Sequence, residues 1–163
     1  MLQAFHNSLL RAIVAAGALA AVGYVAGGCS PAAAAVPQGV WLLKGKAAVE
    51  IYSCHGMMCG RVLWLRIPRN PRGEPVVDKK NPDPALRRRP ICGLTIIGGL
   101  TPDRTGRWTG GWFYNPDDGV KYKAKAQLMS DNVISARAFL LTPLFGETLT
   151  LARVPHGVTD GWC

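Results

Sequence analysis

The amino-acid sequence predicts an all-β fold, a small antiparallel barrel of roughly eight strands. Two patterns predict it. Polar and apolar residues alternate with a period of two in several segments, and turn sequences rich in Gly, Asn, Asp and Pro separate those segments. No stretch longer than a turn or two has a helical period. Several short strands joined by hairpin turns are typical of a sandwich or a barrel.

Each expected strand follows from this alternation and its bounding turns. The plainest is 120–129, where three lysines alternate with apolar residues, so that one face would meet solvent and the other the core. Turn-forming residues flank it, at 115–119 and at 130–132. The expected strands are residues 39–43, 46–53, 60–67, 92–98, 106–114, 120–129, 133–141 and 147–154.

Residues 1–35 have the pattern of a secretory signal peptide. Arg11 is their only charge, 12–28 is an uncharged run rich in Ala, Val and Gly, and Ala33 and Ala35 supply the small residues of a cleavage site. We therefore expect cleavage after Ala35, which leaves 36–163 as a single barrel domain. Two alternatives stay open: an uncleaved anchor, and a lipoprotein modified at Cys29, where Ala26-Gly27-Gly28-Cys29 loosely resembles a lipobox.

The charge and composition of the chain restrict the classes of partner and the cellular compartment that we expect. The 163 residues include 19 Lys and Arg against 10 Asp and Glu, a net charge of +9, and 48% are hydrophobic, which excludes an acidic disordered chain. Removing Arg11 with the signal peptide leaves +9 − 1 = +8. We expect a periplasmic or secreted protein whose anionic partners are lipids or cell-wall polymers, because an exported protein rarely meets nucleic acid.

The expected domain contains Cys54, Cys59, Cys92 and Cys163. An even number in an oxidising compartment indicates disulfides. Cys54 and Cys59 lie where two strands would join in a hairpin, as a facing pair, so we expect them to be bridged. The alternatives are a zinc site that includes His55 and a Cys54–His55 nucleophile pair. Ligand spacing and the opposite orientations of neighbouring strand residues oppose them. The pairing of Cys92 and Cys163 stays open.

Residues 68–90 interrupt the strands with half of the chain's 12 prolines and seven basic residues. Because proline removes ladder donors, this segment is expected to be a long loop rather than a central strand. Its polar residues form a candidate site for an anion or an envelope surface. The ordinary alternative is that Asp83 caps a turn, Asp78 pairs with an arginine, and the loop only lies over the barrel. The candidate residues are Asp78, Asn81, Asp83, Arg87 and Arg89.

Aromatic residues suggest a second candidate site. Trp64 and Trp112 are candidates for lining an apolar ligand cavity, although core packing is the commoner role of tryptophan. Asp117 and Asp118 fit turn chemistry better than a pair of catalytic carboxylates. The sequence contains no Ser-His-Asp pattern, phosphate loop or zinc-site spacing, so we expect no enzyme, no metal and no cofactor.

Several short motifs together resemble one bacterial family. They are Gly39-Val40-Trp41, Cys54 with Cys59-Gly60, Val62-Leu63-Trp64-Leu65, Asp78, Asn81-Pro82-Asp83-Pro84, Leu86-Arg87, Arg89-Pro90, Gly93-Leu94, Tyr114-Asn115-Pro116-Asp117-Asp118-Gly119, Tyr122 and Phe145-Gly146-Glu147-Thr148. The family is catalogued as domain of unknown function 2147, and the resemblance covers about 39–153. It implies a small exported bacterial protein and supplies no activity. The resemblance implies Trp where Leu149 stands here, so the chain departs from the family on its last expected strand.

The two ends of the domain also resemble lipocalins. Gly39-Val40-Trp41 matches the Gly-x-Trp of their first strand, and Arg153 matches the arginine that packs on that tryptophan. The resemblance implies a lipocalin-like barrel with a structural contact between Trp41 and Arg153. A barrel of eight strands can hold one small ligand.

These observations favour an exported, non-catalytic binding protein of the bacterial envelope. It would bind a small apolar or amphipathic ligand in the barrel, or an anionic envelope component at the basic loop. The alternative is a structural or interaction protein of the envelope without a ligand cavity. The oligomeric state stays open.

Overall fold

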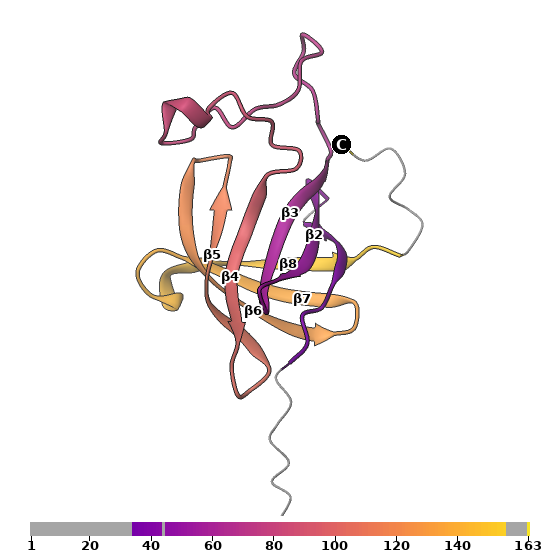
Figure 1. Ribbon diagram of the computed structural model, residues 1–163, viewed down its shortest axis with the longest axis vertical. Helices are drawn as coiled ribbons and strands as arrows, with labels where there is room; N and C mark the ends of the chain where they lie inside the picture. The colour runs from indigo at the N-terminus through magenta and orange to yellow at the C-terminus, as the bar shows by residue number, and fades with distance from the viewer. Residues whose placement is uncertain (1–33, 44, 156–162) are drawn as a thin grey trace, which may run out of the picture. The chain divides into compact units, whose positions relative to one another are not determined.

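Eight antiparallel strands close into a barrel in chain order, from β1 to β8 (Figure 1). The computed structural model describes residues 34–43, 45–155 and 163. The predicted signal sequence up to residue 33, with Cys29, lies outside the described residues. The strands are β1 (Gly39–Leu43), β2 (Ala47–Cys54), β3 (Met57–Leu65), β4 (Thr95–Pro102), β5 (Arg107–Asn115), β6 (Val120–Ser130), β7 (Val133–Phe139) and β8 (Gly146–Arg153). The prediction of an eight-stranded antiparallel barrel is therefore confirmed.

Two short 3-10 helices interrupt the connections, η1 (Pro84–Leu86) and η2 (Pro143–Phe145). Neither of these helices is long and apolar enough to cross a membrane, and the described residues contain no other helix. The connection between β3 and β4, residues 66–94, is named the strap here. It holds the expected loop 68–90 and lies beyond one end of the barrel, at the top of Figure 1.

The strap shifts the limits of the two strands that flank it. β4 begins at Thr95 rather than at the expected residue 92, because Ile91–Leu94 forms a turn in which the Leu94 amide donates to the Ile91 carbonyl. β3 starts earlier than expected, at Met57. The β2–β3 hairpin turns on His55 and Gly56 alone, which have φ of 53° and 77°. Positive φ at both central residues is typical of a two-residue hairpin turn.

A disulfide joins Cys54 to Cys59 at this hairpin, as the sequence predicted, with 5.9 Å between their Cα atoms. The bond excludes both the zinc site and the nucleophile that were its alternatives. The two cysteines do not face each other, however. The two-residue turn sets Cys54 opposite Met57 and Cys59 opposite Tyr52, so the bridge crosses the ladder diagonally.

The barrel interior is filled by alternate residues of the strands. On β6, Ala124 and Ala126 are buried, whereas Lys121 and Lys123, which precede them on the opposite face, are exposed. Gly60 is needed for close packing, since a Cβ there would lie 3.0 Å from the side chains of both Val49 and Ile51. The largest fully buried side chains are Trp41, Trp108, Ile51, Met58, Ile134, Val49 and Asp78.

The pairing of β1 with β8 closes the sheet into a barrel. Trp41 lies opposite Arg153, whose guanidinium carbon is 4.1 Å from the centroid of the indole ring. Arg153 also donates through Nε to the Asp131 carbonyl at 2.7 Å and through Nη1 to the Gln38 carbonyl at 2.8 Å. The Trp41 indole donates to the Pro37 carbonyl at 3.0 Å. The contact that the lipocalin resemblance implied is thus present, and it ties three segments together.

Replacing Arg153 with Ala should lower the free energy of unfolding by about 1–3 kcal/mol, because the variant loses the stacked guanidinium and its two carbonyl contacts together. Urea unfolding followed by tryptophan fluorescence measures the change. Arg104→Ala, in the exposed β4–β5 turn, is the matched control. A loss below about 0.5 kcal/mol for Arg153→Ala, the range of an unengaged surface residue, would contradict the structural role.

Candidate site at the open end of the barrel

The end opposite the Trp41–Arg153 contact is open. Here β1, β3, β5 and β7 finish and the following strands begin, so the strap, the 116–119 turn and the 140–145 loop all surround the same opening. Two hollows of about 450 and 400 Å³ lie there. Both are within the range of pockets that hold small molecules. They are named the mouth hollow and the strap hollow below.

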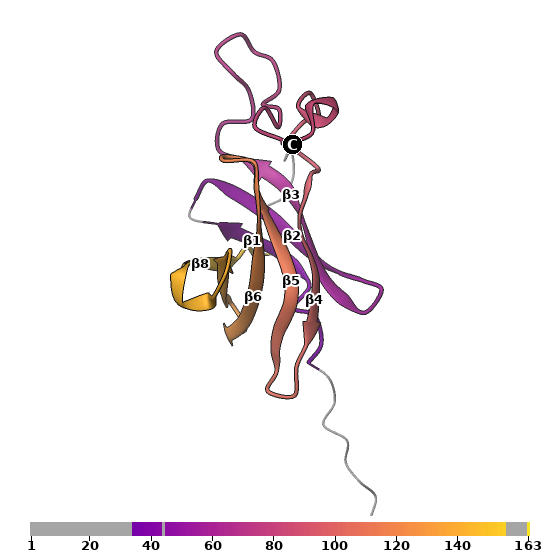
Figure 2. The same ribbon diagram turned by 90° about the vertical axis from the view of Figure 1, so that its left-hand side faces the viewer.

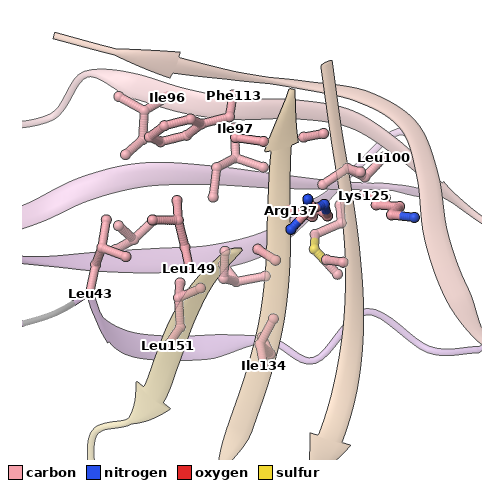
Figure 3. Close-up of a pocket in the computed structure, with 17 residues that line it drawn as sticks. Leu43, Ile96, Ile97, Leu100, Phe113, Lys125, Ile134, Arg137, Leu149 and Leu151 are labelled. Atoms are coloured by element: carbon pink, nitrogen blue, oxygen red, sulfur yellow. The ribbon is translucent and has the colours of Figure 1, made fainter. Parts of the chain in front are cut away.

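The apolar interior leads to both hollows. Figure 3 shows Leu43, Leu149 and Leu151 facing Ile96, Ile97 and Phe113 across the interior. The cavity left between them is about 30 Å³, which is room for about one water molecule. A ligand of any size therefore has to bind mainly at the open end, because the interior is almost completely packed.

The mouth hollow combines an apolar floor with a polar rim. Leu43, Phe113 and Leu149 line both this hollow and the interior, so the apolar surface is continuous between them. The polar and charged rim residues are Lys46, Asn115, Asp117, Asp118, Tyr122 and Glu147. Three carboxylates against one ammonium make this rim acidic, although the chain as a whole is basic.

The strap hollow is more apolar. It shares Leu43 and Phe113 with the mouth hollow, and it continues between the barrel and the strap, which contributes Val76 and Ile91. Arg66, also on the strap, is a charged residue at its edge. Leu43 and Phe113 therefore stand where the interior and both hollows meet.

Hydrogen bonds order the acidic rim. Asp118 accepts from the Tyr122 hydroxyl, from the Asn115 side-chain amide and from the Val120 backbone amide, each at 2.8 Å. The Asp118 hydrogen bond raises the pKa of Tyr122 above its ordinary value, and burial and the charges of Asp118 and Glu147 raise it further. Tyr122 is therefore a neutral hydroxyl at physiological pH. Asp118 therefore stabilises its own turn by accepting these hydrogen bonds, as the sequence indicated.

The five polar residues predicted as a site in the loop come together, but they bind one another. Asp78 is completely buried. Its carboxylate accepts from the Tyr114 hydroxyl at 2.7 Å, from Asn81 Nδ2 at 2.8 Å, and from Arg89 Nε and Nη2 at 3.0 and 2.9 Å. Asp83 caps η1 by accepting from the Ala85 amide, and Arg87 Nε donates to the Asn81 carbonyl.

These contacts set the protonation state of the network. Burial by itself would raise the pKa of Asp78, but the hydrogen bonds from Tyr114, Asn81 and Arg89, with the charge of Arg89, outweigh it and lower that pKa below its ordinary value. Burial and the Asp78 carboxylate raise the pKa of Tyr114. The result is an ionised carboxylate that fastens the strap to β5. None of the five predicted residues lines either hollow, which agrees with the ordinary alternative for this loop.

Trp64 and Trp112 do not line the interior or the hollows, which corrects the ligand-lining role predicted for them. Trp112 lies on the outside of the barrel, against Gly98, with Lys121 Nζ 4.2 Å from its ring centroid. Trp64 is partly buried opposite Ala48 on β2. The aromatic residue that reaches the site is Phe113, which the sequence prediction missed.

A β-bulge explains that error. Trp108 is buried, and unbroken alternation along β5 would place Trp112 on the same side. The register shifts between Trp108 and Gly111, where three residues of β5 oppose two of β6. The extra residue reverses the alternation, as bulges do, and turns Phe113 inward. The adjacent glycines at 110 and 111 were the signal in the sequence.

Comparison with known proteins adds a family and a fold. The family model described as an uncharacterised protein conserved in bacteria, DUF2147, matches residues 39–153. Protein HP1028 from the human pathogen Helicobacter pylori, reported to belong to the lipocalin family, has a similar solved structure. It is 22% identical, with a TM-score of 0.63, over 73% of this chain and 83% of that chain. At this identity the likeness shows the fold. A search of the curated proteins found no match.

Proposed function

We propose, for a chain that belongs to the bacterial family DUF2147, the function of a non-catalytic binding protein that holds a small amphipathic molecule at the open end of its barrel. One observation carries the proposal: the apolar interior surface continues through Leu43, Phe113 and Leu149 into a mouth hollow that ends in a polar rim. The lipocalin-like fold supports it, because eight-stranded barrels can hold one small ligand, which in this packed barrel would bind at the open end.

The lining suggests the chemistry of the ligand. An apolar group would lie against Leu43, Phe113 and Leu149, where burial of each methylene is worth about 0.8 kcal/mol. The polar end of the ligand would meet the Tyr122 hydroxyl and the carboxylates of Asp117 and Glu147. An uncharged or cationic polar group suits this rim, whereas an anionic group would be repelled.

Two features support a location outside the cytoplasm. The described residues contain two disulfides, Cys54–Cys59 and Cys92–Cys163, which persist in oxidising compartments. The signal-peptide pattern of residues 1–35 favours the periplasm or secretion, and lipidation at Cys29 is its minor alternative. A non-catalytic role is supported by the Asp78 network, whose polar groups hold the strap, and by Asp118, whose contacts are with its own hairpin.

Leu149 offers a direct test. It lines both the interior and the mouth hollow, and the family resemblance implies tryptophan at this position. Leu149→Trp should therefore be tolerated by the fold while it fills the hollow. With the neutral fluorescent probe N-phenyl-1-naphthylamine, we expect the variant to bind about tenfold more weakly than the parent, equivalent to losing the burial of about two methylene groups.

Thr150→Trp is the matched control, because Thr150 is exposed on the adjacent position of β8 and should leave probe affinity unchanged. Thermal melting of both variants checks their folding. Equal probe affinity in Leu149→Trp and the parent would place any ligand elsewhere. Native mass spectrometry of protein purified from the producing cells would show whether a natural ligand accompanies it.

The small interior favours one alternative. A cavity of about 30 Å³ suits a barrel that is packed for stability, as in a structural or interaction protein of the envelope. Absence of any co-purified molecule, together with no saturable binding of the probe, would support that alternative over a binding protein.

A further inference from the structure

The loop between β7 and β8 exposes large apolar side chains to an unusual degree. Residues 140–145 are named the apolar loop, and η2 forms its second half. The loop projects sideways from the barrel wall, apart from the strap (Figure 2). Exposed fractions are 54% for Leu140, 84% for Leu141, 79% for Leu144 and 81% for Phe145. Four large apolar side chains in one six-residue loop mark an interaction site rather than scattered surface residues.

Arg137 on β7 holds the apolar loop in shape. Its guanidinium donates through Nη2 to the Leu144 carbonyl at 3.0 Å, through Nε to the Pro143 carbonyl, and through Nη1 to the Thr148 hydroxyl at 2.7 Å. The Phe145 amide donates to the Thr142 carbonyl at 3.2 Å. These bonds satisfy loop carbonyls within the protein, which lowers the cost of moving the loop out of water into an apolar phase.

Positive charge lies directly beside the apolar loop. Lys123 on β6 is paired with Phe139, the residue before the loop, and Lys125 is paired with Arg137. Both lysines, with Lys121, alternate with the buried alanines of β6, so they share its outer face. Neither β6 nor β7 contains an acidic residue. Glu147, two residues after the loop on β8, lies on the side of the mouth hollow.

We propose that the apolar loop inserts into the surface of an anionic phospholipid bilayer, with the lysines of β6 bound to the lipid headgroups. The positive charge beside the apolar loop indicates which partner covers it. Apolar side chains flanked by lysine and arginine are typical of segments that lie in the headgroup region of a membrane. A second copy of the chain would have to bring the same positive face against itself.

Docking in this way brings only the loop side of the mouth hollow to the lipid. Leu140 and Phe145 belong to the apolar loop and also line the mouth hollow. A molecule leaving the bilayer would thus reach the hollow along an apolar surface. The docking itself does not depend on the proposed function, because it requires only the loop and the lysines.

The test measures co-sedimentation of the purified protein with vesicles of phosphatidylglycerol and phosphatidylethanolamine, and with vesicles of phosphatidylcholine alone. All variants carry the same amino terminus, checked by mass spectrometry. We expect Leu141→Ser/Leu144→Ser to lower partitioning onto anionic vesicles by about tenfold or more. Lys123→Gln/Lys125→Gln should lower it by about fivefold per lysine at roughly 0.1 M salt, and much less at high salt, where exposed charges are screened.

Two matched controls sharpen the result. Met129→Ser removes an apolar side chain that is 61% exposed but lies at the other end of β6, and Lys79→Gln/Lys80→Gln removes two charges from the strap. Both should bind vesicles as the parent does. Parent-like binding by the leucine variant, or equal losses in the controls, would overturn the proposal. So would light scattering that shows a parent dimer which the leucine variant converts to monomer, because a second copy would then cover the loop.

Discussion

Asp78→Ala should destabilise the protein by about 3–5 kcal/mol, because it removes the common acceptor of a buried network and leaves Arg89 without its counter-ion. The Tyr114 hydroxyl and the Asn81 amide would lose a partner in the same step, and both residues are buried. Urea unfolding at neutral pH measures the loss. Asp117→Ala, which removes an exposed carboxylate from the β5–β6 turn, should change the stability by less than about 0.5 kcal/mol.

The same network predicts a dependence on pH. The folded protein lowers the pKa of Asp78 below its ordinary value of about 3.9, so the charged form stabilises the fold. That contribution is complete above about pH 5 and is lost as the pH falls below the ordinary value and through the lowered pKa of the folded state. The stability gap between the parent and Asp78→Ala should be constant near neutral pH and narrow in acid. A gap that widens in acid would show that the carboxyl group is protonated in the folded protein.

Removing the bridge between Cys92 and Cys163 should cost about 4 kcal/mol, roughly twice the effect of removing Cys54–Cys59. The first bridge closes a loop with a sequence separation of 71 residues and the second a separation of 5. In the chain-entropy account, a longer loop restricts the unfolded chain more, and the short loop gives only about 2 kcal/mol. Double Cys→Ser variants, unfolded in urea without reductant, give both values.

A matched comparison keeps this result specific. Both double variants remove two sulfurs and one bridge, so their difference reflects the position of each bridge and not the loss of cysteine itself. If Cys54→Ser/Cys59→Ser is the more destabilised of the two, strain or packing at the hairpin outweighs loop length. Equal melting temperatures for the parent and Cys92→Ser/Cys163→Ser would show that the long bridge adds nothing to stability.

The strands could be predicted from the sequence because each one carries its own signal. Alternation along β6 identifies that strand without any knowledge of its neighbours, and the turn residues mark where hairpins reverse. The limits were less predictable where an apolar run continues beyond a strand. Leu140 and Leu141 were assigned to a strand that ends at Phe139, although Pro143 shortly after them indicated a break.

The contacts of the site depend on residues that are distant in the sequence. Asp78 and Tyr114 are 36 positions apart, and no local pattern relates a loop carboxylate to a particular tyrosine. The bridge between Cys92 and Cys163 stayed open for the same reason, since the two cysteines are 71 positions apart and no local pattern relates them. Phe113 was not among the predicted site residues, and alternation alone would not have found it, because one extra residue at the bulge reverses every later side chain on the strand.

The seam between β1 and β8 has a consequence for the order in which the strands pair during synthesis. Seven of the eight strand pairs join consecutive strands, so they can form in turn as the chain emerges. Only the seam must wait for β8, and only the second bridge must wait for Cys163. A chain that stops short of β8 would keep a curved sheet with β1 and β7 as bare edges. Such edges pair readily with other chains. Truncation before β8 would therefore convert a closed barrel into a template for aggregation.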